Sequence, residues 1–271
     1  MTEVDPNTIH RVSHEIKRRR LQVLRVQDLT PRMRRITVGG PELAGFASLG
    51  TDDHVKLLFP QNAEEHAALE NFSPNPSPSP SPSPSIDKAQ GPMPPMRDYT
   101  PRRYDLDTLE LDIDFVLHGD GPAATWAAQA TPGQYLYIAG PRGSMIVPDI
   151  FDSYLLIGDE TALPAIARRL EGLAPNRRAL VVVEVENGAE QQILQSPAQV
   201  HVIWVLREGR QDNLLRTVQQ LDMPGGKLYA WVATESKVSR QIRKVLLEEK
   251  GLDQDFVKAV GYWKLDDSEE D

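Results

Sequence analysis

The sequence predicts an antiparallel β barrel followed by a doubly wound α/β domain with a parallel sheet. Short runs rich in Val, Ile and Leu, separated by Pro and Gly, fill much of the first half of the chain. From about Ser153, strand-like and helix-like segments alternate, which is typical of a parallel sheet covered by helices. The length of 271 residues is sufficient for two domains, each of roughly 100–200 residues.

The barrel strands are expected at residues 21–29, 33–38 and 54–59, and a longer strand is expected at 109–117. In this longer strand, Leu, Ile or Phe occupies every second position, and Glu110, Asp112 and Asp114 stand between the first four of these residues. Because alternate side chains of a strand point to opposite faces, the strand presents one apolar face to a core.

The second half of the chain predicts buried parallel strands at 154–157, 179–185, 200–206, 228–232 and 257–263. Helical periodicity between these runs predicts helices at 161–173, 212–221 and 236–249. In a sheet of this kind, ligands bind at the carboxyl ends of the strands. The hinge between the domains is expected near 147–151.

Two segments are expected to lie outside the packed domains. A Pro-Ser repeat makes 73–95 a disordered loop, because it offers little to bury and few backbone donors for a sheet. Residues 266–271 form an acidic, solvated tail. The expected domains are therefore 17–149 for the barrel and 150–265 for the α/β domain.

Composition excludes several classes of protein. The net charge of -9 argues against binding to nucleic acid. The absence of cysteine excludes disulfides and Cys-ligated iron–sulfur or zinc sites. No apolar leader and no apolar run of ~18 residues is present, so we expect no membrane span and a cytoplasmic location. His10 and His14 lack an evident third ligand, and we expect a mobile pair of histidines rather than a metal site.

Three segments of the first domain suit a flavin dinucleotide. Arg97-Asp98-Tyr99-Thr100 joins an aromatic ring to donors for phosphate, although a core tyrosine alone would explain it. Gly119-Asp120-Gly121-Pro122 leads into a predicted helix at 123–130, whose free N–H groups can face an anion. The glycine-rich turn 140–144 fits either anion binding by its arginine or a simple strand connection.

In the second domain, residues 156–164 read as a strand, a glycine turn and a helix start, where a nicotinamide dinucleotide is expected. The turn lacks the G-x-G-x-x-G fingerprint of many such sites.

Taken together, these segments resemble the siderophore-interacting protein family, whose members are flavin-dependent ferric-siderophore reductases of the ferredoxin-reductase-like superfamily. The resemblance runs from about Lys17 to Lys264 outside the Pro-Ser insert. It implies a Greek-key barrel that holds FAD and an α/β domain that receives NADPH, with NADH as an alternative. The residues that it places at the FAD are Arg97, Tyr99, Thr100, Asp114, Val116, His118, Ala123, Ala124, Trp126, Tyr262 and Trp263. Those that it places at the nicotinamide nucleotide are Gly158, Asp159, Glu160, Thr161 and Glu235.

The resemblance also implies a basic substrate site for an anionic ferric chelate. By position, its candidates are Lys56, Arg142 and Lys264, each of which could also be an ordinary solvent-facing charge. Thr234 departs from the glycine that relatives often carry before the glutamate, and its side chain could narrow the approach of the nicotinamide. The chemistry is expected to be flavin-mediated, with no side chain as nucleophile or general base and no bound metal cofactor.

The expected function is a cytosolic ferric-siderophore reductase that passes electrons from NAD(P)H through FAD to chelated Fe(III) and releases Fe(II). One alternative is a general flavin or ferric reductase without siderophore specificity. Another is a non-catalytic carrier that binds a ferric siderophore. Ferredoxin is an alternative electron donor, and a monomer is expected.

Overall fold

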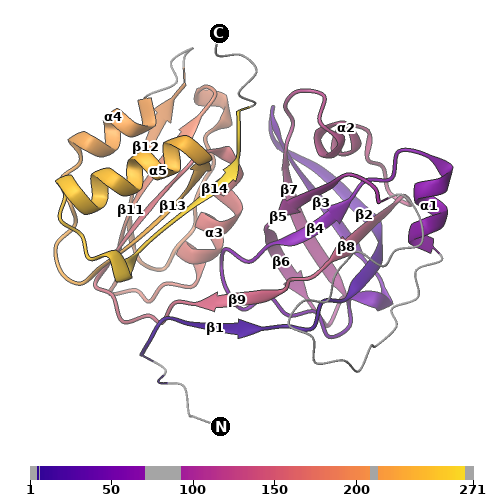
Figure 1. Ribbon diagram of the computed structural model, residues 1–271, viewed down its shortest axis with the longest axis horizontal. Coiled ribbons are helices and arrows are strands. Elements are labelled where there is room, and N and C mark those ends of the chain that lie inside the picture. The colour runs from indigo at the N-terminus through magenta and orange to yellow at the C-terminus, as the bar shows by residue number, and fades with distance from the viewer. Residues whose placement is uncertain (1–4, 6, 71–92, 208–212, 266–271) are drawn as a thin grey trace. The chain divides into compact units, whose positions relative to one another are not determined.

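The computed structural model describes residue 5 and residues 7–70, 93–207 and 213–265 (Figure 1). Contacts divide the chain into two compact units. One unit comprises residues 11–27 and 34–144, and we call it the barrel unit. The other comprises residues 1–10, 28–33 and 145–271, and we call it the parallel-sheet unit. The domain boundaries expected from the sequence remain predictions.

The barrel unit is built on a seven-stranded sheet with the order β5-β4-β8-β2-β3-β7-β6. The strand pairs β2–β8, β4–β5, β4–β8 and β6–β7 are antiparallel. The strands are β2 (Arg18–Thr30), β3 (Met33–Gly39), β4 (Val55–Leu58), β5 (Met96–Tyr99), β6 (Pro101–Asp105), β7 (Glu110–Val116) and β8 (Tyr135–Ala139). The helices of this unit are η1 (Pro41–Leu43), α1 (Ala63–Glu70) and α2 (Pro122–Gln129).

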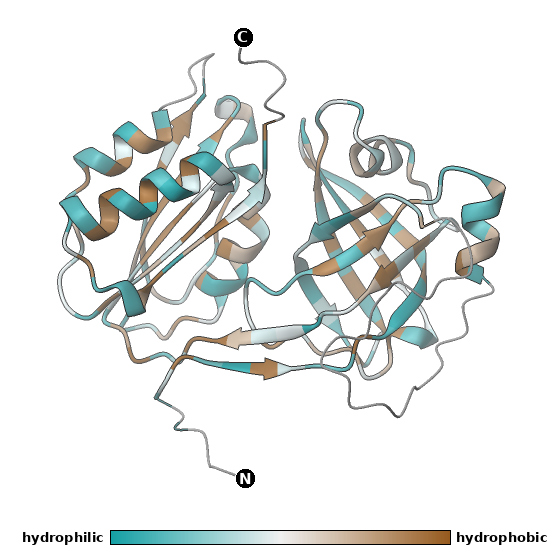
Figure 2. Ribbon diagram, viewed as in Figure 1, coloured by the Kyte–Doolittle hydropathy of each residue, from teal (hydrophilic) through white to brown (hydrophobic). Residues whose placement is uncertain are grey.

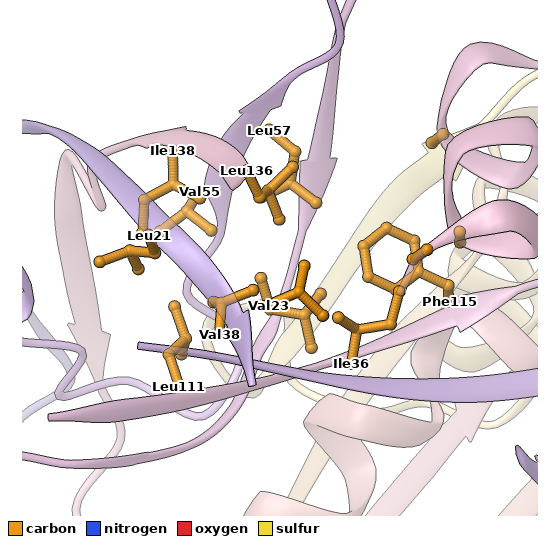
Figure 3. Packing of buried hydrophobic residues seen from close by; sticks show 14 of the residues in the cluster. Leu21, Val23, Ile36, Val38, Val55, Leu57, Leu111, Phe115, Leu136 and Ile138 are labelled. Carbon is orange, nitrogen blue, oxygen red and sulfur yellow. The ribbon is translucent and has the colours of Figure 1, made fainter. Parts of the chain in front are cut away.

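The barrel interior is filled by alternate residues of the strands, as Figure 3 shows for ten labelled side chains from Leu21 to Ile138. The predicted alternation of β7 is confirmed, because Leu111, Ile113 and Phe115 are fully buried. The acidic positions between them are not solvated, however. Asp112 and Asp114 are also buried, since arginine and threonine side chains of other strands cover them.

The parallel sheet has five strands in the order β12-β11-β10-β13-β14, and every adjacent pair is parallel. Its strands are β10 (Ser153–Gly158), β11 (Arg178–Val185), β12 (Gln199–Leu206), β13 (Leu228–Glu235) and β14 (Val257–Trp263). Helices α4 (Asn213–Gln220) and α5 (Ser236–Lys244) cover one face, and α3 (Leu163–Glu171) lies on the other (Figure 1). Their hydrophilic sides are turned away from the sheet (Figure 2). Short helical turns η3 (Glu160–Ala162), η4 (Gly188–Glu190), η5 (Val245–Glu249) and η6 (Gln254–Phe256) complete this unit.

The predicted fold is confirmed, although strands β6 and β8 and the elements named next were not predicted from the sequence. Strands β1 (His10–Ser13) and β9 (Gly143–Ile146) form a separate two-stranded sheet, and helix α1 follows β4. Most of the predicted Pro-Ser loop, the first residue of the predicted helix 212–221 and the acidic tail lie outside the described residues.

Candidate functional site

The first predicted flavin motif, residues 97–100, lies at the end of β5 and reaches the residue before β6. The guanidinium of Arg97 is exposed and donates to the carbonyl oxygen of its neighbour Met96 at 2.8 Å. The ring of Tyr99 lies 4.5 Å from the ring of Phe115, centroid to centroid, at an angle of 38°. Burial raises the pKa of the Tyr99 hydroxyl, so this hydroxyl stays protonated and the side chain is neutral. Thr100 is buried between the two strands. Arg97 therefore offers a charge that the described contacts leave open to an anion.

The second flavin motif lies where β7 ends and α2 begins. Helix α2 starts at Gly121 without a side-chain cap, has proline in its first turn and has no acidic residue there. The N–H of Thr125 donates to Gly121 at 2.9 Å, so the N–H groups of Ala123 and Ala124 have no acceptor within the helix. A helix start of this kind favours a bound anion such as a pyrophosphate.

An open pocket of about 330 Å³ adjoins this helix start. It is lined by Leu117, His118, Gly119, Asp120, Ala124, Thr125, Ala128 and Gln129. The two predicted residues His118 and Ala124 are thus brought together. The sequence analysis missed the other helical residues, although 124, 125, 128 and 129 have the spacing of one helix face. The pocket and the uncapped helix start fit part of a dinucleotide.

The remaining residues of the second motif support the barrel. Trp126 lies 5.8 Å from Phe59 and 5.6 Å from Phe115, between ring centroids, as part of the core. The carboxylate of Asp114 accepts two hydrogen bonds from Arg35, at 2.7 and 2.8 Å. Val116 is half-buried at the end of β7. These contacts fix the strand and helix that border the pocket.

Two of the three candidate substrate cations belong to the barrel unit. The pairing of β4 with β8 sets Lys56 opposite Ala139, close in sequence to Arg142. Lys56 forms an exposed ion pair with Asp98 at 2.9 Å, whereas the side chain of Arg142 is exposed to solvent. Lys264 belongs to the parallel-sheet unit and is exposed.

The predicted nucleotide turn follows β10 and is organised by Asp159. Its carboxylate accepts hydrogen bonds from the Thr161 N–H at 2.9 Å and the Thr161 hydroxyl at 2.5 Å. It also accepts from the Thr234 hydroxyl and the Trp263 indole N–H, each at 2.8 Å. Burial raises the pKa of Asp159, and the hydrogen bonds from these donors oppose the rise. The turn is therefore linked directly to the ends of β13 and β14.

This arrangement explains two features of the sequence. Gly158 has no room for a side chain, because a Cβ there would lie 2.3 Å from the Ala162 Cβ. Thr234 directs its hydroxyl to Asp159 and is buried.

The predicted flavin residue Tyr262 lies on β14. It is half-buried, and its ring packs 6.1 Å from that of Trp231, edge to face.

A partly buried ionic cluster lies at the carboxyl ends of β10, β11 and β12. Arg207 donates to Glu160, Glu184 and Glu186 at distances between 2.9 and 3.2 Å. Burial raises the pKa of Glu184, and Arg207 opposes that shift. Predicted residue Glu160 therefore anchors Arg207. The sequence analysis missed the role of Arg207 because its partners lie 21 to 47 residues away in sequence. Predicted residue Glu235 caps α5 by accepting from the N–H groups of Lys237 and Val238.

Glu186 gives this cluster a measurable dependence on pH. Its hydrogen bond with Arg207 lowers the pKa of Glu186 in the folded state. The stabilisation is therefore present above the unfolded pKa of about 4.3 and is lost as the pH falls through the folded pKa. At pH 7, Glu186→Gln should lower the free energy of unfolding by at most about 1 kcal/mol, because the side chain is partly exposed.

Urea denaturation at several pH values measures this difference. We expect it to shrink below pH ~4. The matched control is Glu248→Gln, whose partner Lys244 lies 3.8 Å away with both side chains exposed, and it should change little. A difference that grows as the pH falls would contradict the assignment.

Comparison with known proteins finds family models that match both halves of the chain. Residues 22–145 match the model of the siderophore-interacting FAD-binding domain, and residues 151–266 match that of the siderophore-interacting protein. The chain is 36% identical over 261 residues to an NADPH-dependent ferric-chelate reductase of Escherichia coli, covering 95% of this chain and 97% of that protein. It is 32% identical over 269 residues to the ferric vibriobactin reductase ViuB of Vibrio cholerae, covering 96% and 95%. A siderophore utilization protein from T. fusca superposes with a TM-score of 0.80 at 36% identity, covering 94% and 96%.

A barrel with a flavin-binding motif, followed by a parallel sheet with a nucleotide-type turn, defines the class of flavin-dependent oxidoreductases. Within that class, the chain belongs to the siderophore-interacting protein family.

In the part of the chain that the structure describes, no helix is long and apolar enough to cross a membrane. Across residues 7–70, 93–207 and 213–265, no group of three or more His, Asp or Glu side chains could hold a metal ion.

Proposed function

We propose that the chain is a ferric-siderophore reductase that transfers electrons from NADPH, through FAD, to Fe(III) in an anionic chelate. The observation that supports this most directly is the uncapped start of α2 beside an open pocket, within the segment that matches the FAD-binding domain. The names of the bacterial relatives supply the ferric acceptor. The location proposed is the cytoplasm, with the chain acting as a monomer.

In this proposal, the barrel unit holds the flavin. Arg97 supplies a charged donor, Tyr99 a flat face braced by Phe115, and the start of α2 two free N–H groups. FAD supplies the conversion of a two-electron hydride donor into single electrons, so two equivalents of Fe(III) are reduced per NADPH. The protein orients the cofactors and supplies the electrostatic environment. The reaction requires no side chain to act as a nucleophile.

The parallel-sheet unit is proposed to receive the nicotinamide nucleotide at the carboxyl ends of β10 and β13. The N–H of Thr161 already donates to Asp159, so the pyrophosphate must find other donors or compete with that carboxylate. NADH and ferredoxin are alternative donors, and steady-state rates with each donor distinguish them.

The substrate is proposed to bind near Lys56 and Arg142. A tris-catecholate complex of Fe(III) carries negative charge, and a local cationic field can attract it to a protein whose net charge is -9. Reduction weakens the complex, because Fe(II) is softer and less highly charged than Fe(III) and is held less tightly by hard oxygen ligands.

Arg142→Ala tests the substrate site. Loss of one charge-assisted contact, worth about 1.5 kcal/mol, should raise the KM for ferric tris-catecholate roughly 10-fold. Steady-state reduction monitored with a ferrous chelator measures it. Arg243→Ala removes another exposed arginine, which lies on α5, and should leave that KM unchanged. An equal rise of KM in the two variants would indicate a nonspecific effect of charge. It would favour the alternative of a general ferric reductase without siderophore specificity.

A further inference from the structure

The turn that carries Arg142 is anchored by the chain itself at several points. The turn begins at Gly140, whose φ of +102° favours glycine, and a Cβ there would lie 3.3 Å from the Arg142 N. The N–H of Gly140 donates to the Lys17 carbonyl at 3.1 Å. The buried side chain of Arg19 donates to the Gly140 carbonyl at 3.2 Å. The backbone on which Arg142 stands is thus fixed at its start.

The end of the turn is fixed by Ser144, which is almost fully buried. Its hydroxyl donates to Oδ2 of Asp53 at 2.5 Å. The N–H of Leu49 donates to the same hydroxyl oxygen at 3.1 Å, and Nε2 of His14 lies 2.7 Å from it. A serine hydroxyl has one proton, and here the carboxylate accepts it. His14 must therefore donate through Nε2–H.

His14 holds the turn a second time through its backbone. Its N–H donates to the carbonyl oxygen of Arg142 at 2.9 Å, while its ring binds Ser144 two residues further on. The expectation of a mobile tail histidine is therefore wrong for His14, because strand β1 and these two contacts order it. Figure 1 shows β1 running beside β9, which begins at Gly143.

Asp53 connects this turn to the other candidate cation. It lies three residues before Lys56, at the entry to β4. Its Oδ2 also accepts from the Ser48 hydroxyl at 3.1 Å and the Gly50 N–H at 3.0 Å, so its position is determined from several sides. Because β4 pairs with β8 at Lys56 and Ala139, the Asp53–Ser144 bond clamps both segments that carry the cations.

We propose that His14, Ser144 and Asp53 form a positioning chain that holds Arg142 at a fixed spacing from Lys56 for binding of an anionic ferric chelate. This inference rests on the proposed function and extends it to residues that touch no substrate. Prearranged cations bind a rigid anion more tightly, because less freedom is lost when the complex forms. The chain acts on affinity for the chelate and not on the flavin.

His14→Ala tests this proposal. Loss of the ring's hydrogen bond, worth about 0.5–1.5 kcal/mol, should raise the KM for ferric tris-catecholate roughly 2- to 12-fold, with kcat within about twofold of wild type. His14→Gln keeps an amide N–H that can donate to Ser144, and it should restore most of the lost affinity. His10→Ala is the matched control, since His10 begins the strand that precedes His14 and its ring contacts the Thr8 carbonyl and not Ser144.

A double-mutant cycle between His14→Ala and Ser144→Ala tests whether the two residues act as one chain. Their effects on KM should be clearly less than multiplicative. Multiplicative effects, an unchanged KM in His14→Ala, or failure of His14→Gln to recover affinity would each overturn the proposal.

Binding of the redox-inert Ga(III) tris-catecholate separates the inference from the proposed function. If the wild-type protein binds this complex without reducing the iron complex, the reductase proposal fails. The positioning chain then stands only if His14→Ala weakens binding 2- to 12-fold. If reduction occurs and His14→Ala leaves both KM and gallium-complex affinity unchanged, the function stands and the inference fails. A wild-type protein that neither binds nor reduces the complexes contradicts both.

Discussion

Arg97→Ala is expected to weaken FAD binding by about 10- to 150-fold, because hydrogen bonds to charged groups contribute roughly 1.5–3 kcal/mol. The guanidinium is exposed and its hydrogen bond in the described structure runs to the adjacent Met96 carbonyl. The fold therefore loses little when it is removed. Fluorescence titration of the apoprotein with FAD measures the affinity, and thermal denaturation of the apoprotein should show a nearly unchanged Tm.

Arg25→Ala is the matched control for this prediction. Arg25 stands on the same barrel sheet but uses its guanidinium in two hydrogen bonds to Glu110, at 2.8 and 2.5 Å. Its removal should lower stability by at most about 1 kcal/mol and leave FAD affinity unchanged. If Arg97→Ala binds FAD as tightly as wild type, the first flavin motif has been assigned wrongly.

Asp159→Ala is expected to destabilise the protein by about 2–4 kcal/mol, because its loss leaves several donors without their acceptor. Most of this loss of stability comes from the buried Thr234 hydroxyl, which is left without an acceptor. The partly exposed Trp263 can instead donate its indole N–H to water. The substitution also removes the hydrogen bond from Trp263 that links the nucleotide turn to the end of β14. Urea denaturation of the apoprotein gives the free energy of unfolding.

The control for Asp159 is Asp253→Ala. Asp253 also caps a short helical turn, by accepting from the Asp255 N–H at 2.9 Å, but it is exposed. We expect a loss of about 1 kcal/mol or less. Equal losses in the two variants would show that Asp159 acts as an ordinary cap and that its contacts with β13 and β14 contribute nothing.

Periodicity predicted the elements that bury a continuous apolar face. The alternation of β7 and the apolar runs of β10 and β11 are local signals, and the structure places all three as expected. Strands β1 and β9 have four residues each, which is too short for a periodic signal. Helix α1 combines alanine, leucine and glutamate in eight residues without an apolar stripe. These elements form where longer-range contacts support them.

The candidate site shows the same division between local and long-range information. The start of α2 could be predicted, because its glycine and proline define a helix start within a few residues. The partners of Asp159 could not, since Thr234 and Trp263 lie 75 and 104 residues away in sequence. His14 and Ser144 are separated by 130 residues, and only the fold brings them together.

The most direct test of the proposed function is an anaerobic absorbance titration of the purified protein, reconstituted with FAD. NADPH is added first, and ferric tris-catecholate follows. We predict that the flavin absorbance is bleached by NADPH and recovers when the iron complex is added, as ferrous iron appears. A protein that takes up no FAD, or a reduced flavin that the ferric complex does not reoxidise, would contradict the assignment.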